Sequence, residues 1–251
     1  MNKLSVIIIA FNEEKNIANC IQSALKISDD IVVVDSYSND RTAEIATSLG
    51  AKVIQQSFLG YAEQKNFAAK HASHEYIISL DADEVLSEEL IQSINKINLS
   101  NHHIYSFNRL TNYCGRFIKH CGWYPDVKCR IYNRTLNKWG GESIHEVLIH
   151  NHASEIIHLE GDLLHYSYYT FSDHLKQLDK FTSLQADELF KKGVKPNLYH
   201  FIIKPHIKFI RDYIIKLGFL DSWEGFSISL ISAFGVYLKY QKLRTLIKKN
   251  S

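Results

Sequence analysis

The chain has 251 residues, of which 45% are hydrophobic and 22% are charged, and this composition excludes a disordered or fibrous protein. Its length suffices for one large domain, or for one domain with an appendage. The formal net charge of +2 is unevenly distributed, because the chain from Lys191 onwards carries twelve Lys/Arg and three Asp/Glu while the first 190 residues carry seventeen and twenty-four. A net charge of +9 beside one of −7 predicts an anionic partner for the C-terminal segment.

Short apolar runs and amphipathic segments alternate along the first part of the chain. Four runs rich in β-branched residues are predicted strands, at Leu4–Phe11, Asp30–Val34, Ala51–Gln55 and Tyr76–Leu80. Helices are predicted between them, at Asn16–Lys26, Arg41–Gly50 and 62–72. This order of continuous apolar strands and helices favours an α/β fold with a parallel, doubly wound sheet covered on both faces.

No targeting segment or disulfide framework is predicted. The first apolar run has little basic sequence before it and is followed directly by Asn12, Glu13 and Glu14, so we interpret it as a strand and not as a signal peptide. The four cysteines have no regular spacing, and a chain of this length does not need disulfides, which indicates a reducing cytoplasm. A zinc site is an alternative with poor ligand spacing, and its members would be Cys114, Cys121, Cys129 and His120.

Polar residues follow the ends of three predicted strands. Asn12 and Asp35 come after the first and second, and Asp81 and Asp83 follow the fourth. Because ligands of parallel α/β sheets bind beyond the carboxyl ends of the strands, we expect these side chains to meet along one edge. Two carboxylates at i and i+2 point to the same side of an extended chain, and a hard cation such as Mg²⁺ or Mn²⁺ would hold them together. The simpler alternative is an acidic turn before a helix that Ser87 caps.

Two common phosphate-binding motifs are absent. Neither G-x-G-x-x-G nor G-x-x-x-x-G-K-[ST] follows the first strand, which argues against a dinucleotide fold and against a P-loop. Phosphate would then have to be neutralised by a metal on the aspartates and by cationic side chains. Lys65 is a candidate, although a solvated helix lysine is the commoner explanation of a single Lys.

Four motifs together resemble the nucleotide-sugar half of glycosyltransferases of family 2, over about residues 3–90. They are IIIAFNEE (7–14), VVVDSYSNDRT (32–42), GYAEQKN (60–66) and SLDADE (79–84). The resemblance implies a GT-A fold with a mostly parallel central sheet. It also implies that Ala10, Phe11 and Glu13 line the nucleotide pocket, that Asp35 binds the uracil, that Lys65 and Asn66 bind the base or diphosphate, that Asp81 binds the ribose or metal, and that Asp83 binds the metal. For Asp40 and Thr42 we favour simple helix capping.

Three later motifs resemble a narrower group, the bacterial lipopolysaccharide inner-core β-1,4-glucosyltransferases. They are CGWYPDVKCRIYNR (121–134), KWGGESIHEVL (138–148) and LLHYSYYTFSDHL (163–175). This resemblance implies inverting transfer of a hexose, glucose from UDP-glucose, onto a core sugar such as heptose. Acceptors based on polyprenyl phosphate or another cell-surface glycan are alternatives, as is a non-catalytic nucleotide-sugar-binding protein.

An inverting transfer needs a base for the acceptor hydroxyl and an electrophile for the departing phosphates. The resemblance places the base in the acceptor half, where Glu146 is our choice, and Asp126 and Glu142 remain candidates because the commoner Glu-Asp pair of the family is missing. The H-E-V-L-I-H run is not a metalloprotease H-E-x-x-H, since its second His comes one position late. His165 is predicted at the metal or diphosphate, against the alternative of an ordinary hydrogen-bonded histidine.

Acceptor-side groups are predicted at Trp123, Asp126 and Arg130. An aromatic face suits a sugar ring, and an arginine suits a phosphorylated acceptor. Trp123 has the alternative of a place in the core.

The C-terminal segment combines helical periodicity with basic charge. A helix is predicted at Thr170–Lys192, and the stretch 207–223 interleaves aromatic residues with lysine and arginine. Residues 225–238 are uncharged but too few to span a bilayer, which needs about 20 residues. This pattern suits peripheral contact with an anionic membrane surface, and a helical pair packed on the catalytic domain or in a dimer is an equal alternative. No nucleic-acid-binding module is recognisable.

We therefore expect a glycosyltransferase domain at 1–168, with a nucleotide-sugar half (1–98) and an acceptor half (99–168), followed by a helical extension at 169–251. The expected cofactor is Mg²⁺ or Mn²⁺. The expected location is the cytoplasm, at the inner face of the cytoplasmic membrane.

Overall fold

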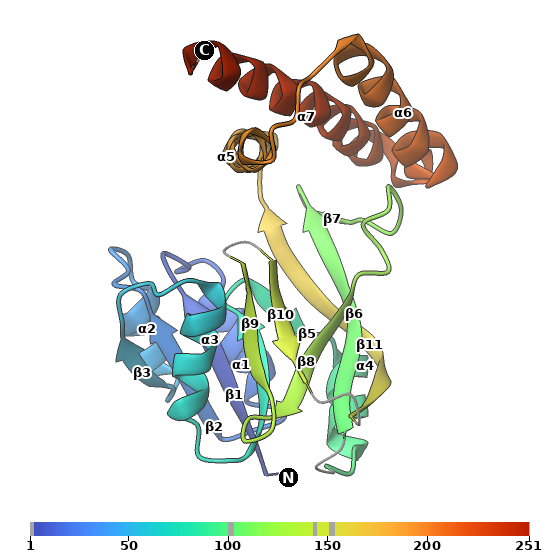
Figure 1. The fold of residues 1–251 in the computed structure, drawn as a ribbon. Helices are drawn as coiled ribbons and strands as arrows, with labels where there is room; N and C mark the ends of the chain where they lie inside the picture. The colour runs from blue at the N-terminus through green and yellow to red at the C-terminus, as the bar shows by residue number, and fades with distance from the viewer. Residues whose placement is uncertain (1–2, 100–102, 143–144, 151–153, 251) are drawn as a thin grey trace. The chain divides into compact units, whose positions relative to one another are not determined.

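The computed structural model describes residues 3–99, 103–142, 145–150 and 154–250 of the chain (Figure 1). The chain forms two compact units. The first consists of residues 1–109 and 126–166, and the second of residues 110–125 and 167–251. The predicted boundary at residue 168 stays a prediction, but the segment Leu110–Pro125 groups with the C-terminal helices in this division.

Four parallel strands form one half of the sheet in the first unit. They are arranged in the order β3-β2-β1-β4 and comprise β1 (Leu4–Ala10), β2 (Asp30–Asp35), β3 (Lys52–Gln55) and β4 (Tyr76–Asp81). All four were predicted within two residues of their observed ends. Strand β1 pairs with β2 on one side and with β4 on the other, and its residues are almost completely buried.

Alternate residues of these strands pack against helices on both faces, as expected for a parallel sheet. Val6 and Ile8 of β1 belong to one core cluster, which includes residues of α1 (Ile17–Ala24), α2 (Thr42–Ser48) and α4 (Glu88–Lys96). Ile7 points to the other face, where it packs in a cluster with α3 (Tyr61–Lys70) and Trp139. The predicted doubly wound α/β arrangement is confirmed.

Antiparallel strands extend the sheet beyond β4. They are β5 (Glu84–Leu86), β6 (His103–Tyr113), β8 (Val127–Asn133) and β11 (Glu155–Tyr168), in the order β4-β8-β6-β11-β5. A separate hairpin of β9 (Lys138–Glu142) and β10 (His145–Ile149) carries Glu146. The α/β class with a parallel sheet was predicted, whereas these antiparallel strands were not.

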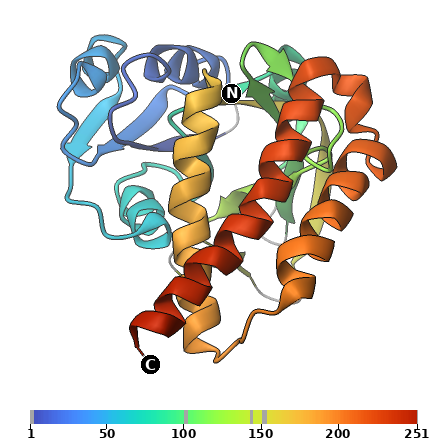
Figure 2. The ribbon, with the colours of Figure 1, turned by 90° about the horizontal axis from the view of Figure 1, so that it is seen from above.

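The second unit is largely helical. It contains β7 (Arg116–Phe117), α5 (Phe171–Lys191), η1 (Tyr199–Ile203), α6 (Lys204–Ile210), η2 (Arg211–Ile215), η3 (Gly218–Asp221) and α7 (Ser222–Lys249). Within this unit α7 lies between α5 and α6 and packs against both (Figure 2). The predicted helix at Thr170–Lys192 is confirmed, and Thr170 begins it with a capping box whose partner is Asp173. No helix in the described part of the chain is long and apolar enough to cross a membrane.

Candidate functional site

The carboxyl edge of the parallel strands gathers the predicted donor-binding residues in the first unit. In the strand registers, Asp35 lies opposite Ala10 and Asp81 lies opposite Ile9. The expectation that residues after separate strands meet along one edge is therefore confirmed for these strand ends. Phe11 follows β1 and its ring is largely exposed, so it is available to a ligand at this edge.

The loops after β1 and β2 are joined by hydrogen bonds. Asp35 is fully buried, and its carboxylate accepts hydrogen bonds from the backbone N–H and the hydroxyl of Ser38. The backbone N–H of Glu13 donates to Thr42 Oγ1 over 2.7 Å, and that of Glu14 donates to Asp40 Oδ2 over 3.1 Å. Asp40 also accepts from the Thr42 N–H at the start of α2. It therefore bonds the helix start, as favoured from the sequence, and additionally bonds the loop after β1.

Glu13 is a partly buried carboxyl close to other acids. Burial raises its pKa to about 7, although the hydrogen bond from Asn16 acts in the opposite direction. The negative charges of Asp83 and Asp40 raise the pKa further. A carboxyl with this pKa is partly protonated at neutral pH, so Glu13 can donate or accept a hydrogen bond at the edge of the sheet.

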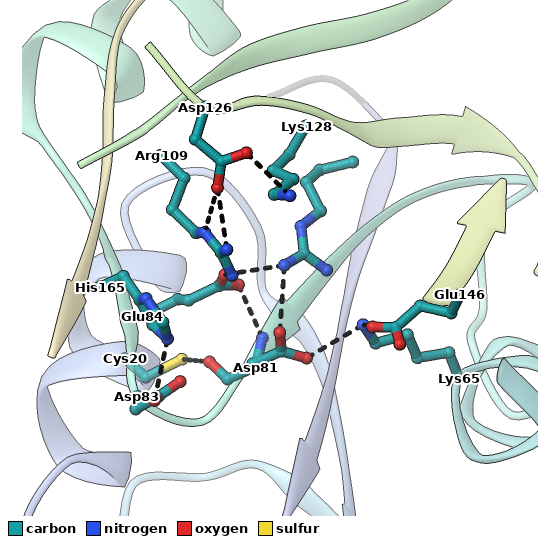
Figure 3. A network of polar contacts seen from close by, with 11 residues as sticks. Cys20, Lys65, Asp81, Asp83, Glu84, Arg109, Asp126, Lys128, Glu146 and His165 are labelled. Carbon is teal, nitrogen blue, oxygen red and sulfur yellow. Dashed lines mark hydrogen bonds and ion pairs between the residues drawn. The ribbon is translucent and has the colours of Figure 1, made fainter. Parts of the chain in front are cut away.

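A buried network of opposite charges surrounds Asp81 (Figure 3). Its carboxylate lies 3.1 Å from Lys65 Nζ and 3.1 Å from Arg130 Nη2. Burial by itself would raise the pKa of Asp81, but the two cations outweigh it and hold this pKa far below its usual value. Asp81 is thus ionised over the whole physiological range.

Lys65 also brings the predicted base to this place. Its ammonium is fully buried and lies 2.8 Å from Glu146 Oε1 (Figure 3). It lies over the ring of Trp139 as well, 4.7 Å from the ring centre. One lysine therefore ties Glu146 on the β9–β10 hairpin to Asp81 at the end of β4.

Asn66 fixes the hairpin that carries Glu146. Its side-chain amide donates to the carbonyl of Trp139 and accepts from the N–H of the same residue, both over 2.9 Å. This two-fold contact positions β9 against α3. The predicted contact of Asn66 with the base or diphosphate stays a prediction. In the structure, the side-chain amide is engaged with the backbone of Trp139.

Asp83 and His165 form a second pair at the edge, with 3.2 Å between Oδ2 and Nε2 (Figure 3). Burial would lower the pKa of His165, but the adjacent Asp83 carboxylate reverses the effect and raises it. The pair brings together the two residues predicted to hold a metal. No group of three or more His, Cys, Asp or Glu suited to a metal ion occurs among the described residues.

The residues present nevertheless fit Mg²⁺ or Mn²⁺ as partial ligands. These ions are commonly held by one or two protein groups, while phosphate oxygens and water complete the shell. Asp83 supplies a carboxylate oxygen from the turn between β4 and β5, and His165 supplies a ring nitrogen from β11, which pairs with β5. The set is too small for a closed structural metal site, but it suits a metal that is bound together with a diphosphate.

Glu84 and Arg130 are two members of the network that the sequence did not identify in this role. Glu84 is fully buried; its Oε1 accepts from Arg130 over 2.7 Å, and its Oε2 accepts from the Asp81 N–H over 2.9 Å. Burial raises the pKa of Glu84, and Arg130 opposes this shift. Arg130 itself is almost completely buried. Its predicted contact with an acceptor stays a prediction that this burial does not favour.

The other predicted acceptor-side residues lie in different surroundings. Asp126 accepts from Arg109 over 2.8 Å and from Lys128 over 2.9 Å, at the start of β8 in the first unit. Trp123 belongs to the second unit, where its ring packs against those of Tyr113 and Tyr168. The ring centres are 5.9 Å and 5.6 Å away, respectively. The side chain of the alternative base Glu142 lies outside the described residues.

The sequence matches a family model described as glycosyl transferase family 2 over residues 5–153. An uncharacterised glycosyltransferase of Rickettsia typhi is 33% identical over 100% of this chain and 89% of its own length. The lipopolysaccharide core biosynthesis glycosyltransferase LpsC of Rhizobium meliloti is 26% identical over 94% of this chain and 93% of its own length.

Two solved structures are also similar. Residues 1–349 of S. aureus TarS match with a TM-score of 0.46 and 16% identity, covering 99% of this chain and 92% of that one. Glucosyl-3-phosphoglycerate synthase of Mycobacterium tuberculosis, crystallised with Mn²⁺ and UDP-glucose, matches with a TM-score of 0.37 and 20% identity over 43% of each chain.

Proposed function

The chain belongs to glycosyl transferase family 2, and we propose that it moves a hexose, glucose from UDP-glucose, onto a sugar of a lipopolysaccharide core. That it is a glycosyltransferase follows from the family and from relatives that align along most of its length. The proposed acceptor is supported by the relative named for lipopolysaccharide core biosynthesis. Heptose is the acceptor sugar we propose.

The contact that carries the proposed mechanism joins Lys65 to both Glu146 and Asp81. A hairpin that follows β8 in the sequence is thereby held at the edge where the parallel strands end. We assign Glu146 as the base, because it is a partly exposed carboxylate in the acceptor half and is fixed to this edge. A general base contributes about 10²- to 10⁴-fold to such a reaction.

In the proposed reaction, Glu146 takes the proton of the acceptor hydroxyl as its oxygen attacks the anomeric carbon. The new bond joins the acceptor oxygen to that carbon, and the bond from the carbon to the phosphate oxygen breaks. Both electrons of the broken bond leave with UDP, and attack from the opposite side inverts the configuration. Lys65 orients the carboxylate of Glu146 throughout, through their 2.8 Å contact.

We propose that Asp83 and His165 hold Mg²⁺ or Mn²⁺ together with the donor. When bound, such an ion supplies charge stabilisation to the departing diphosphate. The other donor contacts that we propose are those of Ala10, Phe11, Glu13 and Asp35 with the nucleoside. All four belong to β1, β2 or the loops that follow these strands.

The proposed location is the cytoplasm, at the inner face of the cytoplasmic membrane. The cysteines of the described chain are free thiols, which suits a reducing compartment.

The experiment that tests the transfer reaction is release of UDP from a panel of nucleotide sugars, with Mn²⁺ or Mg²⁺ and with EDTA, using deep-core lipopolysaccharide as acceptor. We expect release from UDP-glucose that increases with acceptor and stops with EDTA. Equal release of UDP with a polyprenyl-phosphate acceptor would contradict lipopolysaccharide as the acceptor class. Binding of UDP without turnover of any nucleotide sugar in the panel would indicate a protein that binds the donor without catalysing transfer.

The metal proposal has its own test in Mn²⁺ binding measured by calorimetry in the presence of UDP. Asp83→Asn should weaken Mn²⁺ binding about tenfold or more, because it removes one of only two protein ligands. Asp29→Asn is the control, since Asp29 is an exposed aspartate before β2. Unchanged Mn²⁺ binding in Asp83→Asn would contradict the metal assignment.

A further inference from the structure

One face of the helix that runs from η1 through α6 to η2 is apolar and faces solvent. Its members on the helix recur every three or four residues and are each between 46% and 52% exposed: Tyr199, Ile203, Ile207, Ile210 and Ile214. Leu217, which is 44% exposed, continues the set in the turn that follows the helix. We name this set the isoleucine face. Residues at this spacing lie on one side of a helix. Monomeric proteins rarely leave such a continuous apolar stripe in water, so its exposure indicates a partner.

The turn that follows continues the apolar surface. Phe219, Leu220 and Trp223 are 44%, 50% and 70% exposed, and Trp223 stacks on Phe226 with 5.4 Å between the ring centres. Tryptophan is enriched at membrane–water interfaces because its ring is apolar and its N–H is polar. Exposure of this ring at a helix start therefore suits an interfacial position.

This turn is built rigidly, so its exposed side chains are not the result of loose packing. The carboxylate of Asp221 is buried and accepts from the His120 N–H over 2.7 Å and from His120 Nδ1 over 2.9 Å. Gly225 packs so closely that a Cβ there would lie 1.9 Å from the carbonyl oxygen of Gly218. Leu217 and Ser222 have positive φ values of 52° and 57°. Both residues have an unfavourable backbone conformation, and the surrounding packing holds the turn in it.

The charge around the isoleucine face is positive. Of the three acids after Lys191, Asp212 and Asp221 are buried and paired within the unit. Arg211 and Lys216 are exposed and lie on or directly after η2, although Arg211 also pairs with Asp212, as does Lys208. Because both aspartates are buried, basic side chains predominate among the exposed charges of this segment.

We propose that the isoleucine face and the apolar turn dock on the surface of an anionic lipid bilayer. Apolar helix faces lie in the interface plane, while lysine and arginine beside them bind anionic headgroups. A second copy of this chain is a poorer occupant, because it would bring the same positive charge against itself. The absence of a membrane-crossing helix from the described residues agrees with peripheral docking. The proposal rests on the membrane location proposed above and names the surface responsible for it. Its test does not depend on the transfer reaction, because lipid binding requires neither donor nor acceptor.

The test is sedimentation of the full chain with vesicles of phosphatidylcholine alone and of equimolar phosphatidylcholine and phosphatidylglycerol. We expect binding to the anionic vesicles that weakens with added salt. Ile207→Ser/Ile214→Ser should reduce the partition coefficient at least about tenfold, since two partly inserted side chains are lost. The matched control is Leu136→Ser/Ile156→Ser, whose side chains are similarly exposed (56% and 48%) but lie in the first unit.

The contribution of the basic side chains and the depth of Trp223 in the bilayer are measured separately. Arg211→Gln/Lys216→Gln should weaken binding to anionic vesicles about 30-fold, at about 1 kcal/mol for each of the two cations. Brominated lipids should quench the wild-type fluorescence, and Trp223→Phe should remove most of that quenching. Unchanged UDP binding should show that the first unit of each variant folds, and an unchanged helical circular-dichroism signal should show the same for the second unit.

Two results would overturn the proposal. The first is equal vesicle binding by the wild type and by Ile207→Ser/Ile214→Ser. The second is a stable dimer in analytical ultracentrifugation that this double variant dissociates, without any vesicle binding by the wild type. In that case the face would be an interface between copies.

Discussion

The two units of this protein place their unfavourable groups in opposite ways. The first unit buries charge, because Lys65, Glu84 and Arg130 lie inside it and neutralise one another around Asp81. The second unit exposes apolar surface, because the isoleucine face stays in water while Asp212 and Asp221 are buried. Both arrangements are costly in an isolated domain. In each unit the costly groups lie where we propose a contact, with the donor in the first unit and with lipid in the second.

The largest expected effect is on turnover, and it concerns Glu146, the carboxylate that Lys65 holds. Glu146→Gln should lower kcat at least about 10²-fold, since the amide cannot accept the proton of the acceptor hydroxyl. Donor binding should change little, and it should be measured by calorimetry with UDP. Glu160→Gln, at an exposed position of β11, is the matched control. Full turnover of Glu146→Gln with normal UDP binding would place the base elsewhere.

The next effect concerns the stability of the buried charges themselves. Arg130→Met should lower the free energy of unfolding by about 3 kcal/mol, because it leaves Glu84 buried without its closest cation. Lys26→Met removes the exposed pair with Glu88 and should cost less than about 1 kcal/mol. Urea unfolding of both variants measures the difference. Equal costs would mean that the buried network contributes no more than a surface pair.

In the second unit, the stability test alters the close packing of Gly225 against the backbone of Gly218. Gly225→Ala should lower stability by about 2 kcal/mol, since its Cβ would meet the backbone oxygen of Gly218, which cannot move aside easily. Gly235→Ala is the control in the same helix, because its Cβ would meet only the side-chain end of Leu178. Thermal unfolding should rank the two variants in this order. The reverse ranking would show that the turn before α7 is pliable.

The smallest effect is a pH dependence within the second unit. Burial lowers the pKa of His174 to about 4, below its usual value near 6.5. The unfolded chain therefore binds more protons between these values, so this contribution to stability is complete above about pH 6.5 and is lost as the pH falls towards 4. Lowering the pH from 7 to 5 should cost about 1 to 2 kcal/mol through this residue.

The measurement is urea unfolding at pH 7 and pH 5 for the wild type and His174→Gln. The variant should lose less stability on acidification than the wild type does. His206→Gln removes an exposed histidine from the same unit and serves as the control. An identical loss in wild type and His174→Gln would contradict this origin of the pH dependence.

Much of the first unit was predictable because its signals are local. Continuous β-branched runs predicted the four parallel strands, and the fixed direction of parallel strands placed Asp35 and Asp81 at one edge. Ser87 caps α4, since its hydroxyl accepts from the Leu90 N–H. The family resemblance predicted from the strand-end motifs is confirmed.

The partners of the buried charges were not predictable, because they depend on register between distant strands. Arg130 reaches Asp81 and Glu84 only because β8 pairs antiparallel with β4. The available signal was an arginine directly before the buried residues Ile131 and Tyr132 of β8, since a buried guanidinium requires a carboxylate partner. The sequence pattern could not say which carboxylate that would be.

Periodicity and composition were enough to predict the α/β class, the strand-end acids, the helix at Thr170–Lys192 and the basic charge of the C-terminal segment. Folding in three dimensions is what joins Lys65 to Glu146 and Asp81. It also buries Asp212 and Asp221 while the isoleucine face stays exposed. The physical reason is that periodicity identifies an apolar face, whereas packing determines whether that face meets the core or the solvent.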